Sequence, residues 1–189
     1  MGNFYSNYTV RGSSQQAVTA ALAGRKAFVS PIFNGSVVVF DQESDNQDQP
    51  LIGQLALRLS KELHCPVMAV LVHDDDILWY QLCEDGALSD EYNSTPGYFD
   101  FSATETAPPS GGAAEKLCAA FGATVIASVE RILSMPSCAN DGYIFESERH
   151  ADLIQALGLP PFVLGNAYAS FARGEFPEGL SERDMMSSA

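Results

Sequence analysis

Basic residues are scarce in this sequence: 10 Lys and Arg stand against 24 Asp and Glu, which gives a formal net charge of −14. Proteins bind nucleic acids and anionic lipid surfaces mainly through Lys and Arg, which displace counterions. We therefore expect no nucleic-acid partner and no membrane partner. The same charge is compatible with a basic protein partner or with a bound cation.

Long apolar runs and closely spaced cysteines are also missing. No apolar run approaches the roughly 18 residues of a membrane span, and residues 1–12 lack the apolar stretch of a signal peptide. The four cysteines lie far apart, without a C-x-x-C pair: Cys65, Cys83, Cys118 and Cys138. This spacing argues against a zinc site and against a disulfide scaffold. The sequence favours a cytoplasmic protein with free thiols.

Catalytic and cofactor motifs are absent as well. The chain has no G-x-S-x-G, Walker A, G-x-G-x-x-G or H-E-x-x-H motif, so we name no catalytic residue and expect no cofactor. Cys138 lies near Asp141 and His150 in the sequence and would allow a thiol site. A Cys and a His in one chain are weak evidence for such chemistry, because the geometry depends on the fold.

The first half of the chain alternates strand and helix patterns. Apolar and β-branched runs predict strands, and apolar residues at helical spacing predict helices. The expected order is strand 4–10, helix 15–23, strand 26–32, strand 36–40, helix 51–63 and strand 67–72. This β-α-β-β-α-β order is that of the ferredoxin-like fold, an antiparallel sheet with two helices on one face.

Turn signals indicate two hairpins in this half. Asn34-Gly35 separates two apolar runs, and Glu84-Asp85-Gly86 separates further strands at residues 77–83 and 87–92. The second hairpin would extend the sheet to five or six strands. We expect an α+β domain over residues 1–100.

The second half is different in composition. Residues 93–112 are rich in Pro, Gly, Ser and Thr, and we assign residues 101–112 to a linker. Ala-rich and periodic segments then predict a helical extension over residues 113–180, packed on the domain. Residues 181–189 are expected to be frayed.

The candidate binding residues lie between two strong strands, at His73, Asp74, Asp75 and Asp76. Adjacent carboxylates repel one another, and a divalent cation would relieve the repulsion. However, adjacent side chains in a turn diverge and Asp favours turns, so an ordinary turn is the better interpretation. We leave the identity of any metal open.

Aromatic residues of the neighbouring strands, including Trp79 and Tyr80, complete the candidate binding set. On a sheet surface such residues could stack RNA bases, but the negative charge opposes this. Core packing under the helical extension is the better interpretation.

Three stretches resemble a group of bacterial proteins with no assigned function: NFYSNYTVRG from Asn3, DDDILWYQL from Asp74, and ALGLP from Ala156. The resemblance implies a bacterial cytosolic protein. It carries over no catalytic residue.

The leading functional hypothesis is a non-enzymatic interaction protein that docks a basic partner. Residues 62–115 contain 11 acidic residues and no Lys or Arg. One alternative is a divalent-metal-dependent enzyme that uses Asp74, Asp75 and Asp76. Another is a small-molecule binding domain with a pocket between sheet and helices. Exposed strand edges would also allow a homodimer.

Overall fold

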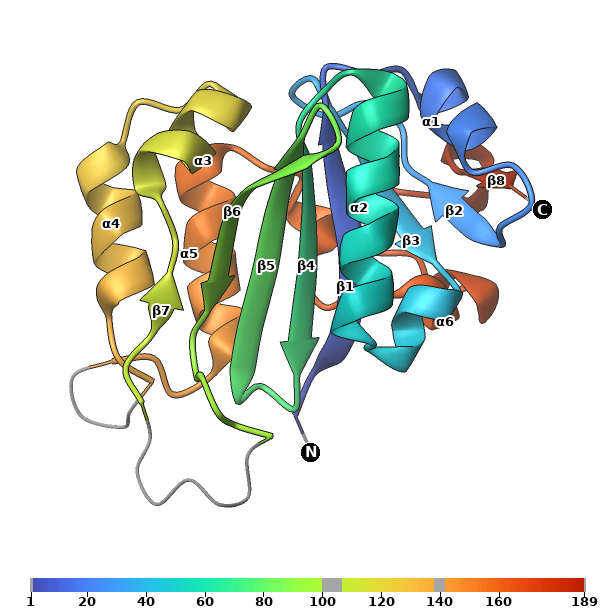
Figure 1. Cartoon of the computed structure of the whole chain (residues 1–189). Helices are drawn as coiled ribbons and strands as arrows, with labels where there is room; N and C mark the ends of the chain where they lie inside the picture. Colours follow the sequence, from blue (N-terminus) through green and yellow to red (C-terminus); the bar gives the residue numbers. More distant parts are fainter. Residues whose placement is uncertain (1, 100–106, 138–141, 189) are drawn as a thin grey trace.

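The computed structural model describes residues 2–99, 107–137 and 142–188, which form one large antiparallel sheet with helices on both faces (Figure 1). The eight strands are β1 (Phe4–Arg11), β2 (Ala27–Val29), β3 (Ser36–Asp41), β4 (Val67–His73), β5 (Ile77–Glu84), β6 (Ala87–Asn93), β7 (Ser110–Gly111) and β8 (Met186–Ser188). The α-helices in the described residues are α1 (Gln15–Ala21), α2 (Gln49–Leu63), α3 (Ala114–Phe121), α4 (Ile126–Ser134), α5 (Glu146–Leu157) and α6 (Tyr168–Ala172). Short 3₁₀ turns add η1 (Glu43–Asn46), η2 (Pro161–Val163) and η3 (Glu182–Asp184). The α+β class predicted from the sequence is confirmed.

The strands follow the order β7-β6-β5-β4-β1-β3-β2-β8, and each neighbouring pair is antiparallel. The two predicted hairpin turns are present. Asn34 and Gly35 have φ of 47° and 76°, and Asp85 and Gly86 have φ of 49° and 78°. Left-handed conformations at both turn residues match the twist of the flanking strands.

Period-two alternation divides the side chains between two cores. On β3, Val37 and Val39 belong to the core under α1 and α2, whereas Val38 and Phe40 belong to the core under α3, α4 and α5. A strand that is buried on both faces reads as a continuous apolar run. The Val37-Val38-Val39 run therefore belongs to an interior strand of the sheet, between β1 and β2.

The α2 helix begins two residues before the expected range of 51–63, at Gln49. The Asp48 side chain accepts the backbone N–H of Leu51, and Pro50 occupies the first turn. Leu51, the first residue of the expected helix, is 47% exposed and does not face the sheet. Ile52, Leu55, Ala56 and Leu59 make the contact with the sheet.

The helices of the second half pack on the sheet face opposite α1 and α2. Leu117 of α3, Ile132 of α4 and Leu153 of α5 share one buried cluster with Tyr80 and Tyr92 of the sheet. Figure 1 shows these helices gathered on the side of β5, β6 and β7. None of the helices in the described ranges combines the length and the apolar character that a membrane crossing requires.

Two expectations about connecting segments were wrong. Part of the expected linker forms β7, which pairs with Tyr92 and Asn93 of β6. The tail expected to be frayed forms η3 and then β8, which pairs with β2 and brings Met186 against the core. In the part of the chain that the structure describes, the sheet therefore has eight strands rather than five or six. Both additions satisfy backbone groups of strands that would otherwise lie at an open edge.

Candidate functional site

The four candidates from His73 to Asp76 form the tight turn between β4 and β5. Asp74 and Asp75 have left-handed backbone conformations, with φ of 52° and 60°. Asp tolerates this region better than most residues. The turn lies at the end of the sheet where β1 begins, because Phe4 pairs with His73.

The three carboxylates of this turn diverge, and each has its own donor. Asp74 Oδ1 accepts the backbone N–H of Gly2 at 2.9 Å. Asp75 Oδ2 accepts the backbone N–H of Asn3 at 2.9 Å. Asp76 Oδ2 accepts the Tyr98 hydroxyl at 2.9 Å. This arrangement is that of a turn rather than of a shared cation site.

Asp75 has a structural role. It is only 8% exposed, and its backbone carbonyl accepts the N–H of Glu146 at the start of α5. Burial raises the pKa of its carboxyl group, but hydrogen bonds from Ser147 and Asn3 outweigh burial and bring the pKa below the ordinary value. Asp75 thus ties the start of β1 and the start of α5 to the turn.

His73 is also held by the protein. Its Nδ1 lies 2.5 Å from the Gln47 side-chain oxygen. Across the described ranges, no group of three or more His, Cys, Asp or Glu residues is arranged to hold a metal ion. The sequence-based alternative of a metal site at Asp74–Asp76 gains no support from this geometry.

Exposed apolar side chains surround the turn. Phe4 is 49% exposed and packs edge-on against His73, with ring centroids 4.8 Å apart. Phe99 is 53% exposed, and its ring lies 5.2 Å from that of His73. Ile144 and Phe145, which precede the Asp75-bound Glu146, are also more than half exposed. We call Phe4, Asp74, Asp76, Phe99 and Phe145 the turn-end surface.

Trp79 and Tyr80, the remaining candidates, lie on opposite faces of β5. The Tyr80 hydroxyl donates to Asp90 Oδ2 at 2.7 Å within the α3–α5 core, and burial raises the pKa of this hydroxyl above its ordinary value. Tyr80 is therefore a core residue, as the aromatic pattern predicts. The Trp79 ring lies in the other core, and its Nε1–H donates to Glu91 Oε1 at 3.1 Å.

Gln81 and Glu91 lie beside Trp79 and were not among the residues that the sequence pattern singled out. Gln81 and Glu91 are register partners on β5 and β6, and Gln81 Nε2 donates to Glu91 Oε1 at 3.0 Å. With α2 they line a groove of about 360 Å³. The available signal was the period-two spacing of Trp79 and Gln81, which places them on one face.

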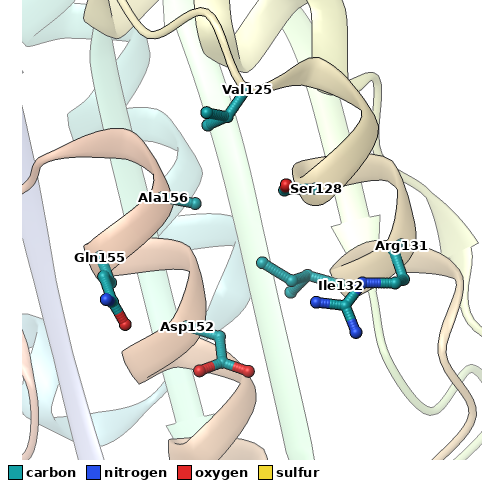
Figure 2. Close-up of a pocket in the computed structure, with 7 residues that line it drawn as sticks. All are labelled: Val125, Ser128, Arg131, Ile132, Asp152, Gln155 and Ala156. Carbon is teal, nitrogen blue, oxygen red and sulfur yellow. The ribbon is translucent and has the colours of Figure 1, made fainter.

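A second hollow, of about 350 Å³, lies between α4 and α5. Figure 2 shows the Arg131 side chain of α4 and the Asp152 side chain of α5 in the space between the two helices, and Ser128 and Gln155 also line the hollow. Asp152 already accepts the Tyr143 hydroxyl at 2.6 Å. The hollow combines opposite charges and so favours no one class of ligand.

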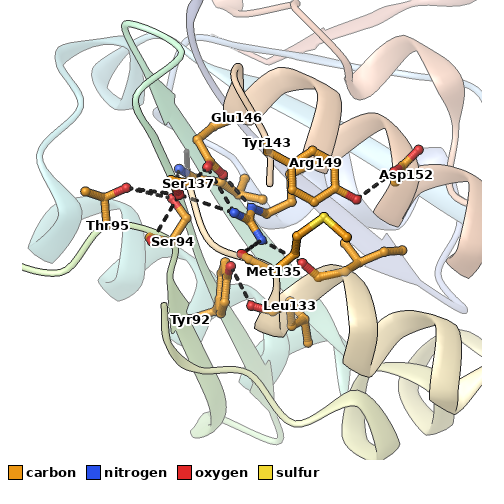
Figure 3. A network of polar contacts seen from close by, with 12 residues as sticks. Tyr92, Ser94, Thr95, Leu133, Met135, Ser137, Tyr143, Glu146, Arg149 and Asp152 are labelled. Carbon is orange, nitrogen blue, oxygen red and sulfur yellow. Dashed lines mark hydrogen bonds and ion pairs between the residues drawn. The ribbon is translucent and has the colours of Figure 1, made fainter. Parts of the chain in front are cut away.

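A buried polar network links α5 to α4, the two helices that border this hollow (Figure 3). Arg149 donates to Glu146, to the carbonyl oxygens of Ile132 and Met135, and to the Ser137 hydroxyl. The Arg149 guanidinium also lies 4.5 Å from the centre of the Tyr143 ring. These contacts join α4 to α5 and leave the guanidinium no access to solvent.

The histidine of the thiol-site hypothesis is a core residue. His150 is completely buried, and its Nδ1 lies 2.8 Å from the Tyr5 hydroxyl. Burial lowers the pKa of His150 to about 3, so the ring stays neutral. Cys138 and Asp141 lie outside the described residues. A neutral imidazole without solvent access is poorly suited to serve as a general base for substrate.

Comparisons with protein-family models, with curated proteins and with solved structures found no match in any of the three.

Proposed function

We propose that this chain is a non-enzymatic interaction protein that docks a basic partner protein through the turn-end surface. The observation that carries the proposal is the mixture of exposed aromatic side chains and carboxylates around the β4–β5 turn. Phe4, Phe99 and Phe145 are each about half exposed, and Asp74 and Asp76 lie among them. Large exposed apolar groups with a polar rim are typical of protein-binding surfaces.

The charge of this end favours a basic partner. Residues 2–7, 70–80, 93–99 and 142–148, which supply the surface and its surroundings, contain no Lys or Arg. The carboxylates at Asp74 and Asp76 are thus not neutralised by a neighbouring side-chain cation of these segments. Such a surface attracts Lys and Arg of a partner and steers their approach.

In our proposal, the turn-end surface lies at one end of a ferredoxin-like unit. We propose that β1 to β4, with α1 and α2, form a ferredoxin-like unit, supported by the strand order β4-β1-β3-β2 and by the shared core of the two helices. The ends β7 and β8 are two and three residues long, which leaves little edge for pairing between sheets. We place the protein in the cytoplasm, in keeping with the free thiols of Cys65, Cys83 and Cys118.

The test uses defined peptides rather than an unidentified ligand. A fluorescein-labelled peptide that alternates Lys with Leu and Phe is compared with a peptide in which Glu replaces each Lys, by fluorescence anisotropy at low and raised salt. We expect the basic peptide to bind, the acidic peptide not to bind, and salt to weaken the binding. Phe99→Ala should weaken binding about tenfold and Asp76→Asn about threefold.

The matched control is Asp85→Asn, which removes an exposed carboxylate at the opposite end of β5 from the β4–β5 turn. This variant should bind like the wild type. If Asp85→Asn weakens binding as much as Asp76→Asn, the peptide senses only the net charge and the turn-end surface is not the docking site. Asp75 stays unchanged in all variants, because it supports the fold.

A further inference from the structure

The groove beside α2 contains the Glu91 carboxylate, and hydrogen bonds hold only one of its two oxygens. Glu91 Oε1 accepts both the Trp79 indole N–H and the Gln81 amide. Oε2 accepts no hydrogen bond from any described residue, and the side chain is exposed. A carboxylate oriented through one oxygen presents the other to a ligand.

A glycine in the middle of α2 shapes this groove. Gly53 is buried, and a Cβ at this position would lie 2.3 Å from Gln81 Oε1. Glycine inside a helix costs about 1 kcal/mol relative to alanine. The missing side chain of Gly53 lets the Gln81 side-chain oxygen lie against α2. The Gln81 side-chain N–H then points toward Glu91.

The remaining walls are uncharged. Gln49, Gln54, Pro50 and Leu57 line the groove from α2. The two cations of α2 face other neighbours. Arg58 donates to the Ala21 carbonyl and pairs with Glu62, and the Lys61 stem packs near Gly86. The groove thus offers one carboxylate oxygen, amide groups and the apolar side chains of Pro50 and Leu57, without a cation in its lining.

We infer that this groove binds a guanidinium group, namely an arginine side chain of the basic partner, so the inference rests on the proposed function. A guanidinium presents several N–H donors in one plane and can bond to Glu91 Oε2 and to glutamine oxygens together. The aliphatic stem of an arginine would lie along Pro50 and Leu57.

Other ligand classes fit this groove less well. An anion would meet Glu91 without a neutralising cation in the lining. A sugar ring usually stacks on an exposed aromatic face, and Trp79 is only 3% exposed. An ammonium group is more strongly hydrated than a guanidinium, and it lacks the coplanar N–H donors that would reach Glu91 Oε2 and the glutamine oxygens together.

Trp79 makes the inference directly testable, because it is the only tryptophan of the chain. Its indole N–H shares Glu91 Oε1 with Gln81, so a ligand on Glu91 should change its emission. The probe is N-acetyl-arginine methylamide, compared with the citrulline analogue, which keeps the shape without the charge. We expect a saturable change in Trp79 emission with the arginine probe at millimolar concentrations and none with citrulline.

Glu91→Gln should weaken binding of the arginine probe about fivefold or more, and Asp85→Asn should leave it unchanged. Asp85 is a suitable control because it is an exposed carboxylate in the neighbouring β5–β6 turn. Glu91→Gln alters the surroundings of Trp79. Binding of the arginine probe to this variant is therefore also followed through the NMR shift of the Gln81 side-chain amide. Equal responses to arginine and citrulline, or wild-type affinity in Glu91→Gln, would overturn the inference.

Phe99→Ala separates this inference from the proposed function. If the variant loses the labelled peptide but keeps the arginine probe, both assignments stand. If it loses the arginine probe as well, the guanidinium binds at the turn-end surface and the groove assignment is overturned. If the arginine probe binds while no basic peptide responds to Phe99→Ala or Asp76→Asn, the groove stands and the turn-end docking fails.

Discussion

Glu146 Oε2 lies 2.7 Å from Arg149 Nε, and both side chains are almost completely excluded from solvent. Removing one member of a buried ion pair leaves an uncompensated charge, which typically costs about 3–5 kcal/mol. We therefore expect Arg149→Met to lower the free energy of unfolding by roughly this amount. Urea denaturation followed by circular dichroism would measure the change.

The double variant Arg149→Met/Glu146→Leu is the control for charge burial. It removes both charges and should recover part of the loss, because buried ion pairs often gain little over apolar groups of similar volume. Recovery will be incomplete, since the carbonyl oxygens of Ile132 and Met135 lose a donor. A double variant that is less stable than Arg149→Met would contradict the explanation.

The burial of this pair could not be predicted from the sequence. Residues 146–157 fall within the helical extension expected over residues 113–180 and form α5, whose apolar members Leu153, Ile154 and Leu157 face the core. Glu146, Arg149 and His150 continue the same face at spacings of three and four residues. Charged residues are rarely buried, so the pattern alone assigns them to solvent. Their burial depends on donors and acceptors from α4 and from the segment after it.

The candidate site could be predicted only in part, because some of its contacts come from elements that are distant in the sequence. The turn at Asp74 and Asp75 follows from local backbone preferences, which the sequence shows. The groove at Glu91 depends on which strand side chains α2 leaves uncovered, and that is set by helix packing. Likewise, β8 forms because β2 offers an edge more than 150 residues earlier in the chain, and no local pattern marks that pairing.

His150 should make the protein sensitive to acid. Its pKa is about 3 in the folded chain, against an ordinary value of 6.5, because burial disfavours the charged ring. The unfolded chain therefore binds a proton that the folded chain refuses, and stability falls as pH decreases from about 6.5 toward 3. The slope is about 1.4 kcal/mol per pH unit for this group, or about 2 kcal/mol between pH 6.5 and pH 5.

The measurement is the free energy of unfolding of wild type and His150→Gln across this pH range. Glutamine does not titrate and keeps a polar group near the Tyr5 hydroxyl. The variant should be less stable at pH 7, but its stability should change less between pH 6.5 and pH 5. Parallel curves for the two proteins would show that His150 is protonated without cost.

Asp75 and Asp76 should respond very differently to the same substitution. Asp75→Asn places an amide beside the donors from Asn3 and Ser147, and unsatisfied buried groups cost about 1–3 kcal/mol. Asp76→Asn keeps an acceptor for the Tyr98 hydroxyl and is exposed to solvent, so its stability should be close to that of wild type. Thermal unfolding of the two variants gives the comparison. A larger loss in Asp76→Asn than in Asp75→Asn would mean that the roles are reversed.

Gly53→Ala tests whether Gln81 is held in place by the glycine. Alanine favours the helix by about 1 kcal/mol, but its Cβ would displace Gln81 Oε1, which is the far end of a flexible side chain. Gln81 can rotate away at modest cost, so the free energy of unfolding should stay within about 1 kcal/mol of wild type. The rotation separates Gln81 from Glu91, and Trp79 becomes the remaining donor to Oε1.

Trp79 emission should therefore shift, and affinity for the arginine probe should fall. A strongly destabilised variant would mean instead that Gln81 cannot move, and unchanged emission with full affinity would mean that Gly53 does not shape the groove.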